Sequence, residues 1–117
     1  MADPSQSVTD YMAAWNETDA GKRRALLDRC WAEEGVYQDP TAYVAGRDAL
    51  DAHIVQFHTN MPGCRIETTS ALDTHHDACH FTWSMVGPDG GVRAAGRDFG
   101  TFDGEGRVKS ITGFFGV

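Results

Sequence analysis

The N-terminal half of the chain carries apolar residues at the spacing of amphipathic helices. A first helix begins at Asp3-Pro4, an N-cap followed by proline at the first helical position, and it ends at the sequence Asp-Ala-Gly of residues 19–21. A second helix continues to about residue 35. A third runs from Arg47 to about residue 60, where a Pro-Gly pair stops it. The predicted apolar faces consist of Val8, Tyr11, Met12, Trp15, Leu26, Leu27, Cys30, Trp31, Leu50, Ile54, Phe57 and Met61.

A short extended segment is expected between the second and third helices, over residues 36–39. Pro40 disfavours the helical conformation at Asp39, so this carboxylate lies at the edge of an element. Residues 40–46 are expected to form a loop.

From Cys64 onward the period of the pattern changes to two. Turn sequences at residues 75–77, 88–91 and 103–106 separate four strands, which we expect to pair as an antiparallel meander. In the second strand the odd positions face the helices; they are Cys79, Phe81, Trp83 and Met85.

The third strand places an acidic residue on the inner face of the sheet. Arg93 and Arg97 belong outside, so the even positions point inward; these are Ala94, Gly96, Asp98, Gly100 and Phe102. The small residues on both sides of Asp98 predict open space beside it. The pattern therefore indicates a carboxylate in a roomy, apolar concavity.

The composition is that of one globular domain. With 117 residues, of which 41% are hydrophobic and 23% charged, the chain can build one core but not two. Residues 1–117 are thus expected to form a single α+β domain around an internal small-molecule pocket.

The charge and the termini restrict the classes of partner. A net charge of −7 opposes binding to nucleic acid and to anionic membranes. The N-terminal sequence lacks the basic start and apolar run of a leader, and no stretch approaches the ~18 apolar residues of a membrane span. A cytoplasmic protein without nucleic-acid or membrane partners is expected.

Neither the cysteines nor the histidines form the pattern of a metal site. Cys30, Cys64 and Cys79 are widely spaced, which favours reduced and buried thiols. The histidines around residues 75–80 lie on a turn and an outer strand face, and they lack a closed tetrahedral set. No metal and no other cofactor is expected.

Two sequence motifs and the order of elements resemble a known family over nearly the whole chain. They are FDGEGRV at residues 102–108, and YQDP at residues 37–40 before GRD at 46–48. Together they resemble the SnoaL-like branch of the nuclear transport factor 2-like superfamily. The resemblance implies three N-terminal helices packed in the concave face of a curved, mostly antiparallel sheet, a cone with a pocket at its wide end. It also implies a homodimer through the outer sheet surface.

Within that superfamily the chain is similar to ketosteroid isomerase at three positions. The tyrosine of its first helix, its Asp-Pro aspartate and its strand aspartate fall on Tyr11, Asp39 and Asp98. The resemblance implies that Asp39 shuttles a proton, while Tyr11 and a protonated Asp98 donate hydrogen bonds to the developing enolate oxygen. The chain departs from the isomerase at Ile54, where a supporting tyrosine would be expected, in its shorter 40–46 loop, and at Trp83, which narrows the cavity.

Other enzymes of the superfamily are similar in fold and differ in chemistry. In SnoaL-type polyketide cyclases an acid/base aspartate falls at or near Asp98. Limonene epoxide hydrolase needs an arginine on the same face as its strand aspartate, whereas Arg97 points away. Scytalone dehydratase uses inward histidines, whereas His80 points outward and only His53 is left.

Two functional hypotheses follow. The first is a cofactor-independent acid/base isomerase or cyclase acting on a hydrophobic carbonyl compound, with Asp98, Asp39 and Tyr11 as catalytic residues. The alternative is a non-catalytic ligand-binding or dimerisation module, in which the two carboxylates accept structural hydrogen bonds and Tyr11 packs in the core. The residues expected to contact the ligand are Trp15, Tyr37, His53, Phe57, Phe81, Trp83, Met85, Ile111 and Phe115.

Overall fold

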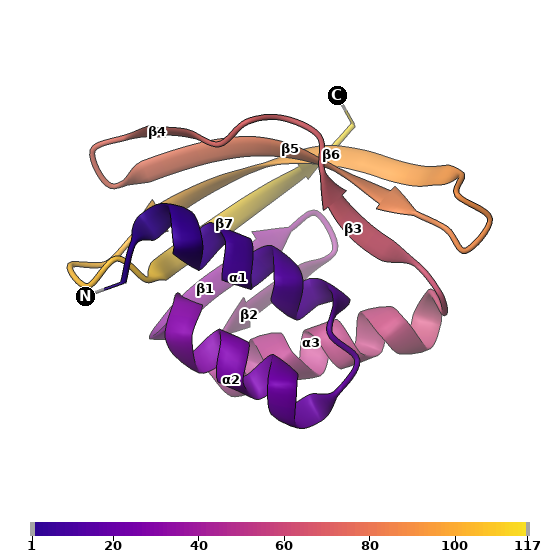
Figure 1. Cartoon of the computed structure of the whole chain (residues 1–117), viewed down its shortest axis with the longest axis horizontal. Helices are drawn as coiled ribbons and strands as arrows, with labels where there is room; N and C mark the ends of the chain where they lie inside the picture. Colours follow the sequence, from indigo (N-terminus) through magenta and orange to yellow (C-terminus); the bar gives the residue numbers. More distant parts are fainter. Residues whose placement is uncertain (1, 117) are drawn as a thin grey trace.

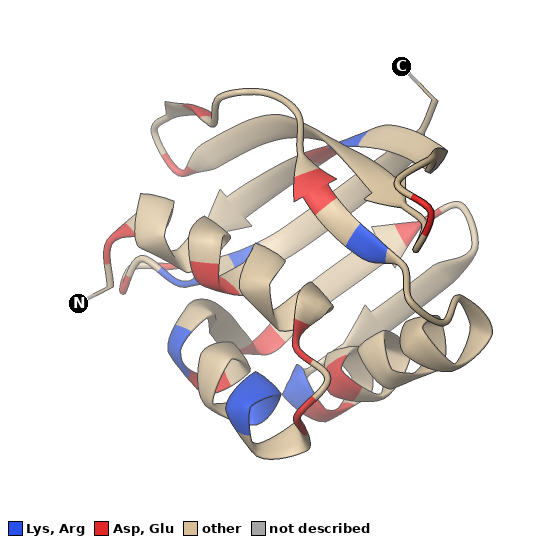
Figure 2. Cartoon of the chain, turned by 45° about the vertical axis from the view of Figure 1, so that its right-hand side comes forward, with Lys and Arg blue, Asp and Glu red and all other residues tan. Residues whose placement is uncertain are grey.

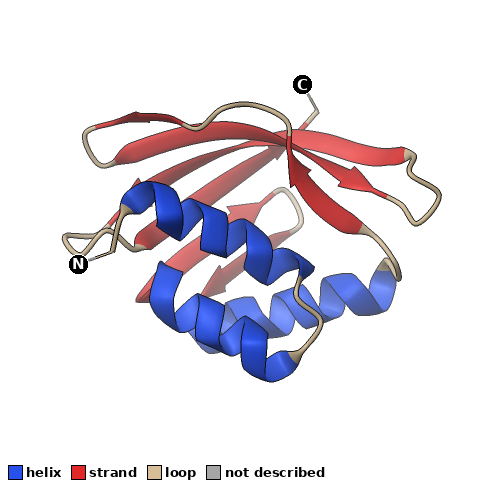
Figure 3. Ribbon diagram, in the orientation of Figure 1, coloured by secondary structure: helices blue, strands red, loops and turns tan. Residues whose placement is uncertain are grey.

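Three helices cover the concave face of a curved sheet in the computed structural model, which describes residues 2–116 (Figure 1; Figure 3). The helices are α1 (Pro4–Asn16), α2 (Ala20–Cys30) and α3 (Arg47–Asn60). The strands are β1 (Trp31–Asp39), β2 (Ala42–Ala45), β3 (Arg65–Thr68), β4 (Asp73–His75), β5 (Ala78–Val86), β6 (Val92–Phe102) and β7 (Val108–Phe115). The expected α+β class is confirmed.

The sheet is mixed, with antiparallel pairs in the majority. Its order is β2-β1-β7-β6-β5-β3, and β4 pairs with β5 beside this path. The meander β5-β6-β7 is antiparallel as expected, whereas β1 runs parallel to β7. This parallel pairing joins the first half of the chain to its last strand and closes one side of the cone.

The predicted ends of the first helix are close to those observed. The Asp3 side chain accepts a hydrogen bond from the Ser5 amide at 3.1 Å, and Pro4 is the first helical residue. The Ser7 hydroxyl donates to the Gly106 carbonyl at 2.7 Å, which ties α1 to the turn between β6 and β7. Helix α1 is therefore held against the sheet with Tyr11 and Trp15 buried.

Three expected boundaries were wrong. The second helix ends at Cys30 rather than near residue 35, because Trp31 begins a nine-residue strand that pairs with both β2 and β7. Residues 40–46, expected as a loop, contain β2, and the first strand expected after Cys64 is divided into β3 and β4. In each case pairing with another strand decided the conformation, which local propensity does not report.

The inner and outer faces of β6 are those predicted. Asp98 and Phe102 are buried on the inner face, whereas Arg97 and Phe99 are exposed on the outer one. Asp98 does line an open cavity, as expected, but the flanking glycines do not create it, because neighbouring side chains fill the space above them. A Cβ on Gly96 would meet the Trp83 ring at 2.5 Å, and one on Gly100 would lie 2.8 Å from Ile111. The glycines admit these side chains instead of leaving a hollow.

Ion pairs hold α3 against α2. Helix α3 forms one wall of the pocket described below. Arg23 of α2 donates to Asp51 of α3, and Arg24 donates to Asp48. Figure 2 shows this basic segment of α2 facing acidic residues of α3. Arg23 is almost fully buried and Asp51 is partly exposed, so the pair is partly shielded from solvent.

The three cysteines are free and buried, as expected. Burial raises the pKa of the Cys30 thiol to about 12 and that of Cys79 to about 11, so both are unreactive at neutral pH. Over residues 2–116, none of the helices combines the length and apolar character that crossing a membrane requires.

Candidate functional site

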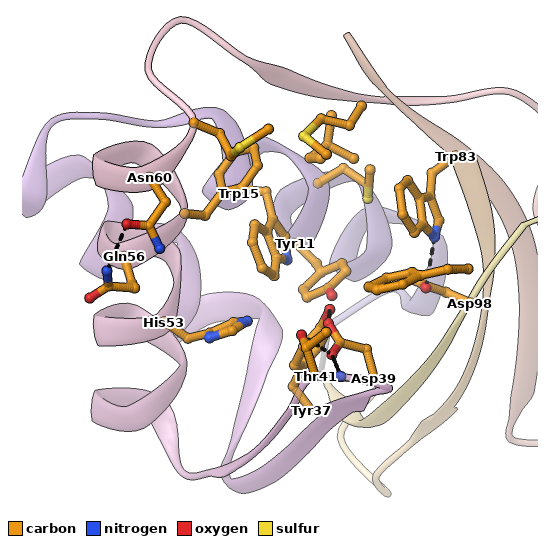
Figure 4. Close-up of a pocket in the computed structure, with 16 residues that line it drawn as sticks. Tyr11, Trp15, Tyr37, Asp39, Thr41, His53, Gln56, Asn60, Trp83 and Asp98 are labelled. Atoms are coloured by element: carbon orange, nitrogen blue, oxygen red, sulfur yellow. Dashed lines mark hydrogen bonds between the residues drawn. The ribbon is translucent and has the colours of Figure 1, made fainter. Parts of the chain in front are cut away.

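A pocket of about 430 Å³ opens between α1, α3, the β1–β2 hairpin and the inner face of β5–β7 (Figure 4). Its volume lies within the range of ligand-binding pockets, about 300–1,000 Å³. It is lined by Tyr11, Met12, Trp15, Tyr37, Asp39, Thr41, His53, Gln56, Phe57, Asn60, Met61, Ile66, Trp83, Met85, Asp98 and Phe115. The three side chains predicted as catalytic thus line the same cavity.

The Asp98 carboxyl group is the most perturbed acid of the pocket. It is 6% exposed, and its Oδ1 accepts a hydrogen bond from the Trp83 indole Nε1 at 2.9 Å. The pKa of Asp98 is raised from 3.8 to about 7, chiefly by burial; the hydrogen bond from Trp83 opposes this shift and the charge of Asp39 adds to it. Near neutral pH this carboxyl group therefore exists in both protonation states.

Two glycines on neighbouring strands make room around Asp98. Gly96 lies opposite Trp83 in the β5–β6 register, so the indole can cross the strand and reach the carboxylate. Gly113 lies opposite Asp98 in β7. A Cβ on Gly113 would be 2.9 Å from Asp98 Oδ1 and 3.5 Å from Asp39 Cβ. Gly113 thus lies between the two acids and lets them face the same space.

Asp39 ends β1, and local hydrogen bonds engage both of its oxygens. The Tyr37 hydroxyl donates to Oδ2 at 2.5 Å, while the Thr41 amide and hydroxyl donate to Oδ1 at 2.7 and 2.8 Å. Burial pushes the pKa of Asp39 upward, but these bonds and the nearby His53 outweigh it, and the pKa lies below 3.8. Asp39 is therefore ionised at neutral pH.

Two tyrosine hydroxyl groups stay protonated in the pocket. Burial, followed by the charge of Asp98, raises the pKa of Tyr11 well above 10.0. Burial, followed by the hydrogen bond to Asp39, raises the pKa of Tyr37. The Tyr11 ring stacks on Trp31 with centroids 5.4 Å apart, which holds it facing the cavity. Both phenols can act only as neutral hydrogen-bonding groups.

Aromatic side chains from α1, α3 and β1 form the apolar wall. The Trp15 ring lies 5.5 Å from Tyr37, 5.7 Å from His53 and 5.6 Å from Phe57, measured between centroids. All four were predicted as ligand-contacting residues, and all four line the pocket.

Two predicted ligand contacts lie outside the pocket, and a third lies at its rim. Phe81 and Ile111 are 1% and 0% exposed in the core and do not line the pocket, because the strands that carry them pack there against the helices. Phe115 lines the pocket as expected but is 50% exposed. It lines the rim and meets Trp83 edge-on at 6.0 Å, because the end of β7 extends past the cover of the helices.

The sequence reasoning missed six lining residues: Met12, Thr41, Gln56, Asn60, Met61 and Ile66. Met12 and Met61 were assigned to core stripes. A signal existed for Gln56 and Asn60, since they follow His53 by three and seven positions and so share its helix face. Thr41 follows the Asp-Pro pair in a turn, where its amide and hydroxyl cap Asp39.

The pocket can carry out proton transfer in an apolar environment. It combines a carboxyl group that titrates near neutrality, an ionised carboxylate and neutral phenols, and such separated acidities are typical of acid/base sites. Between residues 2 and 116, His, Cys, Asp and Glu side chains do not gather into a group of three that could hold a metal ion.

Comparison with known proteins identifies the family. The profile of the SnoaL-like domain matches residues 8–111. A candidate isomerase of the SnoaL-like family from Agrobacterium tumefaciens strain C58 has 32% identity, with all of both chains covered and a TM-score of 0.91.

More distant structures share the fold. A nuclear transport factor 2-like protein of unknown function from Exiguobacterium sp. 255-15 has 14% identity and a TM-score of 0.75, covering 94% of this chain and 98% of its own. A candidate polyketide cyclase from Sinorhizobium meliloti has 16% identity and a TM-score of 0.73, with 92% of this chain and 93% of the cyclase chain covered. A search among curated proteins finds no match. The domain match over residues 8–111 and the similarity to the Agrobacterium protein over the full chain establish that this chain belongs to the SnoaL-like family.

Proposed function

We propose that the protein is a cofactor-independent acid/base isomerase or cyclase that acts on a hydrophobic carbonyl compound bound in the pocket. The observation that carries the proposal is the buried Asp98 carboxyl group, which lies on the wall of a largely apolar cavity with a pKa of about 7. A general base is most effective when its pKa is near the working pH.

The proposed reaction begins with the ionised form of Asp98. Its carboxylate takes a proton from the carbon next to the substrate carbonyl, and the electron pair of that C–H bond moves onto the carbonyl oxygen as an enolate. The Tyr11 hydroxyl donates a hydrogen bond to this oxygen, where the negative charge develops. In an isomerase, the protonated Asp98 returns the proton to another carbon. In a cyclase, the enolate carbon attacks a second carbonyl group, and Asp98 protonates the new alkoxide.

Asp39 has a supporting role in this scheme. The resemblance to ketosteroid isomerase assigned the proton shuttle to this residue, but hydrogen bonds from Tyr37 and Thr41 engage both of its oxygens. Its lowered pKa makes it a weak base. Its fixed negative charge instead raises the pKa of Asp98 across Gly113. The arrangement favours Asp98 as the group that exchanges the proton.

The names of two relatives are compatible with the same reaction class. The Agrobacterium protein is a candidate isomerase and the Sinorhizobium protein a candidate polyketide cyclase. Proton transfer next to a carbonyl group serves both isomerisation of ketones and cyclisation of polyketides.

Hydrogen–deuterium exchange of a simple ketone tests the proposal. Proton NMR in D₂O follows exchange of the acidic carbon-bound protons of β-tetralone, a bicyclic ketone. We expect the wild-type rate to rise with pH through about 7, since the base form of Asp98 is required. Asp98→Asn should lower the rate on the order of a hundredfold or more.

The matched control is Asp73→Asn, which alters an exposed carboxylate on β4 outside the pocket and should leave exchange unchanged. Equal exchange in the wild type and in Asp98→Asn would contradict the proposal. Binding of β-tetralone without enzyme-dependent exchange would instead favour the ligand-binding module.

A further inference from the structure

A second polar group of the pocket lies on α3, away from Asp98. His53, Gln56, Phe57 and Asn60 line the cavity from one face of this helix. Figure 4 shows Gln56 and Asn60 on the opposite side of the pocket from Asp98 and Trp83, with Trp15 and Tyr11 between them. The cavity therefore has polar groups at two separated places and aromatic surface in the middle.

Gln56 and Asn60 bond to each other and retain hydrogen-bonding capacity. The Gln56 Nε2 donates to Asn60 Oδ1 at 3.0 Å. This leaves the Gln56 carbonyl oxygen and the Asn60 amide nitrogen without partners among residues 2–116. If both amides were flipped, the Gln56 amide nitrogen and the Asn60 carbonyl oxygen would be the free groups instead. The pair thus offers a donor and an acceptor side by side in either arrangement.

A hydroxyl group matches such a pair, because it donates one hydrogen bond and accepts others. A ketone or an ether oxygen would use only the amide N–H and leave the exposed carbonyl oxygen to solvent. A carboxylate would meet that carbonyl oxygen with repulsion. Neither Gln56 nor Asn60 carries a charge that would recognise an ionised group.

We propose that Gln56 and Asn60 form a distal subsite for a hydroxyl group, so that the substrate is a ring-containing ketone with a hydroxyl group at the end opposite its reacting carbonyl. The hydroxyl end follows from the α3 amide pair, and the apolar ring system from the aromatic side chains of Trp15 and Phe57 that line the cavity. The carbonyl end rests on the proposed function of Asp98.

Two matched ketones test the subsite by isothermal titration calorimetry. One is β-tetralone, and the other is 6-hydroxy-β-tetralone, which carries a hydroxyl group at the far end of the same ring system. The wild type should bind the hydroxylated ketone about fivefold or more tightly than β-tetralone, the effect of one or two net hydrogen bonds. The double variant Gln56→Leu/Asn60→Leu should lose this preference and keep its affinity for β-tetralone.

The control is Thr59→Leu, an exposed change on the same helix that does not line the pocket and should keep the preference. Gln56 and Asn60 are themselves exposed at the pocket mouth, so the double variant should retain its thermal unfolding temperature. Equal wild-type affinity for the two ketones, or an unchanged preference in the double variant, would overturn the subsite. A preference that depends on Gln56 and Asn60 without proton exchange would uphold the subsite and reject the proposed reaction.

Discussion

Replacing Asp98 by asparagine should stabilise the protein at high pH. In the folded state burial raises the pKa of this carboxyl group from its ordinary value of 3.8 to about 7. Between these two pH values the folded state binds a proton that the unfolded state has released. The free energy of unfolding therefore falls as pH rises through this window. Above about pH 7 the full destabilisation caused by ionised, buried Asp98 is present.

The magnitude follows from the pKa difference. Each pH unit within the window costs about 1.4 kcal/mol, and the difference between 3.8 and about 7 corresponds to about 4 kcal/mol. Asparagine cannot ionise, and its carbonyl oxygen can still accept the hydrogen bond from Trp83. Asp98→Asn should thus unfold with a free energy up to about 4 kcal/mol above the wild type at pH 8, and with a similar value near pH 4.

Urea unfolding at a series of pH values between 4 and 8 measures this effect. Asp39→Asn is the matched control, for which we expect the opposite change in stability. The lowered pKa of Asp39 contributes stability above pH 4, which is lost as pH falls, so this variant should be less stable than the wild type at neutral pH. A loss of stability in Asp98→Asn at every pH would make that residue a structural acceptor, and a pH-independent difference would refute a raised pKa.

Three further changes have defined outcomes. Gly113→Ala places a Cβ 2.9 Å from Asp98 Oδ1, so it should displace the carboxylate and slow hydrogen–deuterium exchange of the ketone about tenfold. The control is Gly104→Ala, which should leave the exchange rate unchanged because no atom lies within 4 Å of its added Cβ. An unchanged rate in Gly113→Ala would show that the carboxylate position is not critical. Trp83→Phe removes the donor to Asp98, so the midpoint of the pH–rate profile should move above that of the wild type; a midpoint at or below it would count against the Trp83 bond. We also expect a homodimer through the outer sheet face, whose residues are Arg97, Phe99, Thr101, Thr112 and Phe114. Phe99 and Phe114 are 45% and 47% exposed there. Light scattering should give twice the 12.8 kDa of one chain for the wild type and a single chain for Phe99→Asp; a 12.8 kDa particle at all concentrations would exclude the dimer.

Periodicity was sufficient to predict the features that depend on local geometry. Alternation along residues 92–102 placed Asp98 on the inner face and Arg97 on the outer one, because neighbouring residues of a strand point to opposite sides. Helical spacing likewise placed Tyr11 and Trp15 on the buried face of α1. The position of Asp39 at the end of a strand followed from the restriction that Pro40 imposes.

Features that depend on contacts between distant segments required the tertiary structure. Trp31 belongs to a strand because β7, far along the chain, pairs with β1, and no local signal encodes a partner at that separation. The packing of side chains from different strands decides two further features. Trp83 fills the space at Gly96, and Phe81 is buried outside the pocket.

The acidities of the pocket were decided in the same way. The sequence by itself determined that an acid at position 98 points inward, but a pKa depends on burial, on hydrogen-bond donors and on charges within a few ångströms. Only the fold brings the Trp83 indole and the Asp39 carboxylate next to Asp98. Asp39 instead receives its hydrogen bonds from Tyr37 and Thr41, each two residues away in the sequence. The two aspartates thus have opposite pKa shifts, because tertiary packing buries Asp98 whereas nearby donors stabilise the charge of Asp39.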